Sequence, residues 1–302
     1  MDTHRKPLTM PTLLKPGIMK KVLSLDGGGL KELRALEVLI WLEAQTGQPC
    51  NKLFDEIVGT SAGGIVALGL GRGLSALALK QFFTSSGPAI FHASLWRSFK
   101  TLGGIAAPSK YDGLALHAAL LKTFGNSSIP AGVRVATFDT LAWTPRVLSS
   151  ALPWTCVEAA LATSAAPTYF PAFVKGDRAY WDGGICMNNP ALLTDVGEQA
   201  LILSLGDGSA AHGMAPEQVV KLHPLEVIGP VLSACMDGGV ALVTIEAMAQ
   251  KNLTYVRIQG GPYDNDALDD ASVGNMNLLS AQGQATIGQF EGELQRVLSI
   301  LT

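Results

Sequence analysis

A serine between glycines near residue 60 has the residue types and spacing that acyl transfer needs. Residues 59–63 read Gly-Thr-Ser-Ala-Gly, which fits the pattern G-x-S-x-G. A serine on a sharp strand-to-helix turn is pushed into the open, and small neighbours let a substrate carbonyl approach it. The helix after the turn directs N–H groups at the same point and favours negative charge there. We therefore predict that Ser61 is a nucleophile; the alternative is an ordinary strand–helix turn.

A second glycine-rich stretch could stabilise the negative charge that such a reaction creates. Residues 26–29 read Asp-Gly-Gly-Gly, and three successive glycines expose a row of backbone N–H groups. Fixed donors of this kind form oxyanion holes, and one donor lowers the barrier by about 3 kcal/mol. The rival interpretation is a phosphate-binding loop, but neither G-x-G-x-x-G nor G-x-x-x-x-G-K-[ST] is present. We predict an oxyanion loop here.

A serine nucleophile also needs a base, and the sequence offers a carboxylate and two histidines downstream of the serine. The order serine, acid, histidine would be met by Asp182 followed by His212 or His223. His212 lies in a predicted loop and His223 precedes a proline, so a surface or capping role is favoured for both. Asp182 precedes two glycines, which would bring its carboxylate close to other backbone. It could act as a base if it bonds Ser61 directly and desolvation raises its pKa.

The elements that must position these residues alternate along the first 75 residues. An apolar strand over Val22–Leu25 leads into the first glycine stretch, and helical spacing follows over Leu30–Gln45. A second strand over Phe54–Val58 leads into the serine turn, and Ile65–Leu70 opens the next helix. This alternation predicts an α/β fold with a mainly parallel central sheet and helices on both faces.

The rest of the chain continues the pattern, without repeats, linkers or blocks of charge. We expect a loose leader over residues 1–19, one domain over residues 20–302, and an irregular stretch over Gly87–Lys110. The other predicted helices are Leu114–Phe124, Cys156–Ala162, Pro230–Lys251 and Leu278–Leu301. The other predicted strands are Val133–Thr137, Arg146–Leu148, Ala179–Trp181, Ala200–Leu205 and Tyr255–Ile258.

Composition excludes several classes of protein. Of the 302 residues, 48% are hydrophobic and 16% charged, against a usual charged share of about 25%, so disorder is excluded. The net charge of −3 gives no electrostatic footprint for nucleic acid. Mean hydropathy is +0.27, but the most apolar window, Val227–Ile245, contains Pro230 and Asp237 and is rejected as a membrane span.

The N-terminus and the cysteines indicate a compartment. Met1–Lys21 has no apolar stretch of a secretory signal, so the cytoplasm is expected, with action at a membrane surface. The alternative is export without such a signal. The four cysteines, which form no metal-binding spacing, are expected to be reduced thiols in or near the core: Cys50, Cys156, Cys186 and Cys235.

Three motifs together resemble the signatures of patatin-like phospholipases: Asp-Gly-Gly-Gly-Leu-Lys at 26–31, Gly-Thr-Ser-Ala-Gly-Gly at 59–64 and Asp-Gly-Gly at 182–184. Further blocks agree with that family in order along the chain, at 162–171, 188–190, 203–206, 255–258 and 268–271. The resemblance runs from about residue 20 to the C-terminus. It implies a three-layer patatin-like sandwich.

The resemblance also implies roles for individual residues. Ser61 would be the nucleophile and Asp182 the general base of a Ser–Asp dyad. Lys31 would occupy the basic position after the glycines, where arginine is more frequent. The family usually has glycine next, where this chain has Glu32, a carboxylate that could pair with Lys31. The oxyanion loop would be Gly27, Gly28 and Gly29, with support from Gly59, Gly63, Gly183 and Gly184.

The implied activity is hydrolysis of fatty-acyl esters of membrane phospholipids. Two alternatives stay open: an esterase for small or neutral-lipid esters, and a silent lipid-binding protein on the same scaffold. The substrate partner would be a lipid surface, without nucleic-acid polymer. Bacterial relatives in this family include toxins and antiviral effectors gated by cyclic nucleotides, so a small-molecule activator is possible. The sequence leaves the headgroup and the oligomeric state open.

No metal or cofactor is expected. A cluster of acidic residues lacks EF-hand spacing and is interpreted as a solvated loop: Asp264, Asp266, Asp269 and Asp270. Three aromatic residues could form a lid or a membrane-contacting rim, and core packing is the equal alternative: Phe91, Trp96 and Phe99.

Overall fold

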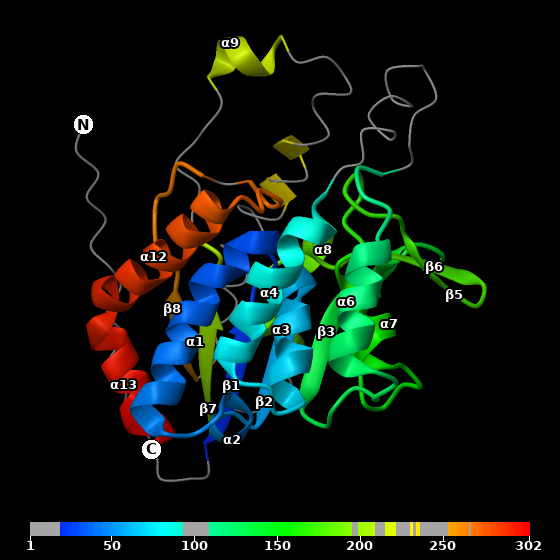
Figure 1. The fold of residues 1–302 in the computed structure, drawn as a ribbon. Helices are drawn as coiled ribbons and strands as arrows, with labels where there is room; N and C mark the ends of the chain where they lie inside the picture. Colours follow the sequence, from blue (N-terminus) through cyan, green and yellow to red (C-terminus); the bar gives the residue numbers. More distant parts are fainter. Residues whose placement is uncertain are drawn as a thin grey trace.

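A computed structural model provides the structure of the protein (Figure 1). It describes residues 19–92, 109–194, 199–208, 215–221, 230–231, 234–235, 253–265 and 267–302. Several sequence-based expectations lie outside these residues: the leader, the two aromatics Trp96 and Phe99, most of the predicted helix Pro230–Lys251, and both candidate histidines, His212 and His223.

The described strands form one sheet in the order β5-β6-β3-β2-β1-β7-β8, with β4 pairing to β3. The five strands that run parallel are β1 (Lys20–Leu25), β2 (Glu56–Thr60), β3 (Val133–Asp139), β7 (Ala200–Leu205) and β8 (Thr254–Ile258). The three strands that pair antiparallel are β4 (Thr144–Ser149), β5 (Phe173–Lys175) and β6 (Arg178–Asp182). The prediction of a mainly parallel α/β sheet is confirmed.

One face of the sheet carries the larger hydrophobic core. Side chains alternate along β1, so Leu23 and Leu25 enter this core, while Val22 faces a smaller cluster with Ala191 and Ile202. On the larger side, α1 packs against α4 and α12 (Figure 1). On the smaller side, the sheet is covered in the described chain by α8 and the 3-10 turn η2. The sheet is thus the middle layer of the sandwich that we expected.

The helices begin and end at residues with clear physical roles. Gly47 ends α1 in the left-handed region with φ of 65°, as glycine allows. Thr155 and Glu158 form a capping box at the start of α7. The helices are α1 (Glu32–Thr46), α2 (Cys50–Leu53), α3 (Ser61–Gly71), α4 (Ala76–Ile90), α6 (Leu114–Phe124), α7 (Cys156–Thr163), α8 (Gly184–Met187), α9 (Pro216–Val219), α12 (Val273–Gln289) and α13 (Glu291–Leu301), with 3-10 turns η1 (Gly29–Lys31) and η2 (Pro190–Leu193).

Several element bounds differ from the sequence-based ones. The second strand is Glu56–Thr60, and α3 begins at Ser61 itself, so the turn is tighter than predicted. Helix α4 continues to Ile90 through Gly87 and Pro88, which sequence analysis had assigned to an irregular stretch. The predicted terminal helix is two helices that meet at Phe290.

None of the helices in the described part of the chain is long and apolar enough to cross a membrane.

Candidate active site

The turn between β2 and α3 holds Ser61 in a strained conformation. Its φ is +54°, a value that residues other than glycine rarely adopt and that marks functional turns. A Cβ on Gly59 would lie 2.3 Å from the carbonyl oxygen of Gly63, and one on Gly63 would lie 2.3 Å from that of Asp26. Both glycines of the G-x-S-x-G pattern are therefore required by backbone that approaches too closely for a side chain.

Sheet register brings Asp182 to this turn. Thr60 pairs with Ala136 on β3, and the next β3 residue, Thr137, pairs with Asp182 at the end of β6. The Ser61 hydroxyl donates to Asp182 Oδ2 at 2.7 Å, although 121 residues separate them. The serine amide donates to Thr163 Oγ1 at 2.9 Å, which fixes the turn from the other side.

Asp182 is buried, and its carboxylate is held by hydrogen bonds alone among the described residues. Its second oxygen, Oδ1, accepts from the amide of Gly184 at 2.7 Å. Burial raises the pKa of Asp182 to about 7, against hydrogen bonds from Ser61 and Gly184 that act in the opposite direction. A Cβ on Gly183 would lie 2.5 Å from the Ala136 carbonyl oxygen, so glycine is needed where β6 passes β3. This carboxylate can accept a proton from Ser61 near neutral pH.

The glycine loop follows β1 and lies against the serine. A Cβ on Gly27 would lie 2.9 Å from Ser61 Cβ. The Gly27 amide donates to Asn188 Oδ1 at 3.1 Å, and Asn188 Nδ2 donates back to the Gly27 carbonyl at 3.0 Å. The amides of Gly28 and Gly29 have no acceptor among the described residues. Because the Gly27 N–H is engaged, we narrow the proposed oxyanion donors to Gly28 and Gly29.

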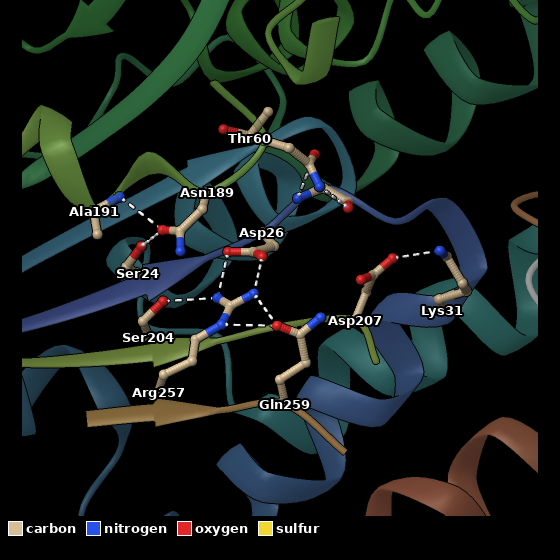
Figure 2. A network of polar contacts seen from close by, with 12 residues as sticks. Ser24, Asp26, Lys31, Thr60, Asn189, Ala191, Ser204, Asp207, Arg257 and Gln259 are labelled. Carbon is tan, nitrogen blue, oxygen red and sulfur yellow. Dashed lines mark hydrogen bonds and ion pairs between the residues drawn. The ribbon is translucent and has the colours of Figure 1, made fainter. Parts of the chain in front are cut away.

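An arginine from the far end of the chain anchors the first residue of this loop (Figure 2). Arg257 on β8 donates two hydrogen bonds to the Asp26 carboxylate, from Nη1 to Oδ1 at 2.9 Å and from Nη2 to Oδ2 at 2.5 Å. The same guanidinium donates to Ser204 Oγ on β7 and to Gln259 Oε1. A bidentate pair of this kind fixes orientation as well as position. The sheet edge and the glycine loop are thus tied together.

A second ion pair supports the loop from below (Figure 2). Lys31 Nζ lies 2.7 Å from Asp207 Oδ2, and the two side chains are only 2% and 4% exposed. Asp207 also packs on the loop, because a Cβ on Gly28 would lie 2.4 Å from its Oδ2. Burial of Lys31 favours loop support over the alternative of contact with a lipid headgroup.

Glu32 is buried beside this pair, and the Lys31 ion pair is with Asp207. Glu32 Oε1 has no hydrogen-bond partner among the described residues. Burial raises the pKa of Glu32 well above its ordinary value, and the carboxylates of Asp207 and Asp26 raise it further. The surroundings of Glu32 therefore favour its neutral form behind the glycine loop.

Sequence analysis assigned no role to Asn188, Asp207 or Arg257. Asn188 and Arg257 lie in the noted blocks 188–190 and 255–258, whereas Asp207 lies just beyond the block 203–206. The signal that could have revealed such residues is the topology, because the carboxyl ends of neighbouring parallel strands meet at one edge of a sheet. This rule would have placed polar residues at the ends of β1 and β7 close together.

An apolar pocket opens onto the serine. It is lined by Ser61 and Gly29 at one end and otherwise almost entirely by hydrophobic side chains. These come from α3, α4, α6 and the segments after α7 and β8, and include Ile65, Phe83 and Leu116. The pocket therefore offers space for an acyl chain next to the hydroxyl that would attack it.

The acidic cluster is not simply a solvated loop. Asp269 Oδ2 accepts from the Tyr111 hydroxyl at 2.6 Å and pairs with Lys110 Nζ at 2.5 Å, because the loop folds back over the pocket wall. Asp266 lies outside the described residues. Phe91 packs edge-on against Tyr111 and lines the pocket, so this aromatic belongs to the pocket wall. In the part of the chain that the structure describes, no group of three or more acidic, histidine or cysteine residues could hold a metal ion.

Comparison with known proteins gives similarities along most of the chain. Residues 23–195 match the family described as Patatin-like phospholipase. Patatin-like protein 2 of Arabidopsis thaliana is 29% identical over 359 aligned residues, covering 94% of this chain and 86% of that protein. The cGAMP-activated phospholipase of Pseudomonas aeruginosa is 33% identical over 234 residues, covering 73% and 66%. The human calcium-independent phospholipase A2-gamma is 25% identical over 317 residues, covering 93% and 40%.

Proposed function

The chain belongs to the patatin-like phospholipase family, and from this premise we propose that it hydrolyses fatty-acyl esters of membrane phospholipids through Ser61 and Asp182. The observation that carries the proposal is the 2.7 Å hydrogen bond from the Ser61 hydroxyl to a buried carboxylate with a pKa of about 7. A base whose pKa lies near the working pH combines a large deprotonated fraction with useful basicity.

Two half-reactions follow from this arrangement. Asp182 takes the Ser61 proton as Oγ attacks the ester carbonyl, and the amides of Gly28 and Gly29 stabilise the oxyanion. Collapse of the tetrahedral intermediate breaks the ester bond, and protonated Asp182 donates its proton to the departing oxygen, which leaves as the alcohol or lysolipid and regenerates the carboxylate. Asp182 then accepts a proton from water as the water attacks the acyl-serine. The second collapse releases the fatty acid and returns the proton to Ser61 Oγ.

The apolar pocket supports a long acyl chain as the group transferred. Its lining around Ile65, Phe83 and Leu116 offers hydrophobic surface and few polar groups. Burial of apolar area is worth about 25 cal/mol per Å², so longer chains should bind more tightly until the pocket is full. This favours lipid esters over small esters. It leaves the headgroup to experiment, and we propose a membrane surface as the place of action.

The test is lipid mass spectrometry after incubation of the purified protein with phospholipid vesicles. We expect release of free fatty acid and lysolipid by the wild type, and less than a few per cent of that by Ser61→Ala. We expect no change with EDTA, in line with the name of the human relative, calcium-independent phospholipase A2-gamma. Hydrolysis of neutral or small esters but of no phospholipid would favour the esterase alternative. Binding of vesicles without any hydrolysis would favour the silent lipid-binding alternative.

A second arm of the same assay concerns activation. The Pseudomonas aeruginosa relative is named for activation by cGAMP. Vesicle hydrolysis is therefore measured with and without that nucleotide. Activity only in its presence would assign this chain the same dependence and support a role as an effector; equal activity would remove that proposal.

A further inference from the structure

The segment 267–271, which we call the strap, contacts the glycine loop from a distant part of the chain. The Leu268 carbonyl accepts a hydrogen bond from the Leu30 amide at 2.9 Å. A Cβ on Gly29 would lie 2.3 Å from the same carbonyl oxygen, so the loop backbone rests directly on the strap. The φ of Gly29 is +58°, a conformation that glycine adopts without strain. The position of the Gly29 amide is therefore set in part by the strap.

The next residue of the strap fastens it to the wall of the acyl pocket. Asp269 Oδ2 accepts from the hydroxyl of buried Tyr111 at 2.6 Å and from Lys110 Nζ at 2.5 Å. Lys110 is half exposed, so its ion pair contributes less than the hydrogen bond from Tyr111. One carboxylate thus carries the attachment of the strap on this side.

Tyr111 packs against two residues that form the pocket wall. Its ring packs at 5.5 Å between centroids against Phe91 and at 5.5 Å against Phe170, and both of these residues line the pocket. The amides of Lys110 and Tyr111 donate to the carbonyls of Thr168 and Tyr169 at 2.7 and 2.8 Å. The anchor for Asp269 is therefore itself rigidly held.

We propose that Asp269 is a positioning residue, which holds the strap against the pocket wall so that Leu268 fixes the glycine loop and its proposed oxyanion donor Gly29. The proposal rests on the proposed function for its kinetic consequence. A displaced oxyanion donor weakens binding of the transition state and leaves binding of the substrate nearly unchanged. Loss of the Asp269 carboxylate should therefore lower kcat and leave KM in place.

The experiment measures Asp269→Ala against Asp270→Ala on p-nitrophenyl esters of short and long acyl chains. Asp270 is the matched control because it lies on the same strap, is exposed, and bonds with Oδ1 to the Ser272 amide of its own segment. We expect kcat of Asp269→Ala to fall about 10-fold or more at every chain length, with KM for short chains changed less than twofold. Because Leu268 also lines the pocket, an unchanged kcat together with a rise in KM for long chains would show that Asp269 only shapes the pocket, and would overturn the proposal.

A double-mutant cycle tests the route of the effect. Tyr111→Phe removes the hydroxyl donor and keeps the ring that packs on Phe91 and Phe170. If both residues act through one hydrogen bond, the double variant Asp269→Ala/Tyr111→Phe loses no more kcat than Asp269→Ala alone. If the fold losses of kcat in the two single variants instead multiply in the double variant, the two residues do not act through one hydrogen bond.

A readout that needs no activity separates this proposal from the proposed function. Hydrogen exchange of the peptide covering residues 26–33 reports the Leu30 amide, which is protected by the strap. We expect that peptide to exchange at least about 10-fold faster in Asp269→Ala than in Asp270→Ala, with peptides of α1 unchanged. Unchanged exchange would overturn the positioning role. Wild-type protein inactive on every ester would refute the proposed function alone.

Discussion

The glycine loop and the proposed dyad each contain a buried aspartate followed by glycines, and the two carboxylates have opposite surroundings. Asp26 is 3% exposed and meets the Arg257 guanidinium in two hydrogen bonds. Asp182 is 1% exposed and is held in the described structure by a serine hydroxyl and a backbone amide. The same Asp-Gly-Gly sequence therefore holds a charged anchor at one site and a candidate base at the other.

The presence or absence of a cationic partner decides whether a buried carboxylate acts as a charged anchor or as a base. A carboxylate that gains a cation keeps its charge and fixes its neighbours, whereas one that loses water without gaining a cation becomes a stronger base. Figure 2 shows the first arrangement around Arg257. The raised pKa of Asp182, about 7, shows the second. The comparison predicts that substitutions at the two sites differ in kind: loss of structure at the first and loss of reaction at the second.

The largest expected effect on stability comes from breaking the anchor. Arg257→Met removes the cation that binds the buried Asp26 carboxylate in two hydrogen bonds, and we expect a cost of about 3–5 kcal/mol of unfolding free energy. The double variant Asp26→Asn/Arg257→Met removes the stranded charge and should recover at least half of the loss. Urea denaturation of both variants measures this. Equal destabilisation of the single and double variants would show that packing, not charge, dominates.

The second expected effect is a loss of turnover when Lys31, which supports the glycine loop, is replaced. Lys31→Ala leaves Asp207 without its ion-pair partner directly under Gly28, and we expect kcat to fall about 10- to 100-fold. Because Lys31 is buried, the loss should be equal on neutral esters and on anionic phospholipids. A loss confined to anionic phospholipids would reassign Lys31 to headgroup binding.

A smaller effect, of opposite sign, is expected on stability at the base. The pKa of Asp182 is higher folded than unfolded, so its contribution to stability is fully present below about pH 4 and is lost as pH rises towards 7. The Asp182→Asn variant has no carboxyl group to ionise, so it does not lose this stability as pH rises. It should be more stable than wild type at pH 8, by a few kcal/mol at most. At pH 4 the two should agree. Urea midpoints at both pH values measure the difference, and a destabilised Asn variant at pH 8 would contradict it.

The smallest effect is expected at Glu32. Burial raises the pKa of Glu32, so its contribution to stability also falls as pH rises through its folded pKa. Glu32→Gln has the same shape without the charge and should be more stable than wild type at pH 8, with turnover within twofold. Chromogenic ester turnover and urea midpoints are the measurements. A loss of turnover of 10-fold or more would show that the Glu32 carboxylate takes part in the loop's function.

The sequence predicted the local geometry of the site better than its tertiary partners. The strand, glycine turn and helix around Ser61 follow from local pattern, and the close backbone contacts at Gly59 and Gly63 explain the spacing. The partners of Asp26 could not be derived in that way, because Arg257 lies 231 residues away and nothing local distinguishes its role. Likewise, Gly87 and Pro88 are typical helix breakers, so the sequence did not predict that the last turn of α4 runs through them and lines the pocket.

The central claim is that Asp182, rather than a histidine, removes the proton from Ser61. The most direct measurement is the rate at which a fluorophosphonate probe labels Ser61, followed by intact mass from pH 5 to 9. It compares wild type with Asp182→Asn, His212→Ala and His223→Ala. We predict a wild-type rate that rises with a midpoint near pH 7, histidine variants that follow it, and an Asn variant about 10²–10⁴-fold slower without that midpoint. Loss of two orders of magnitude in either histidine variant, or a wild-type rate in Asp182→Asn, would contradict the dyad.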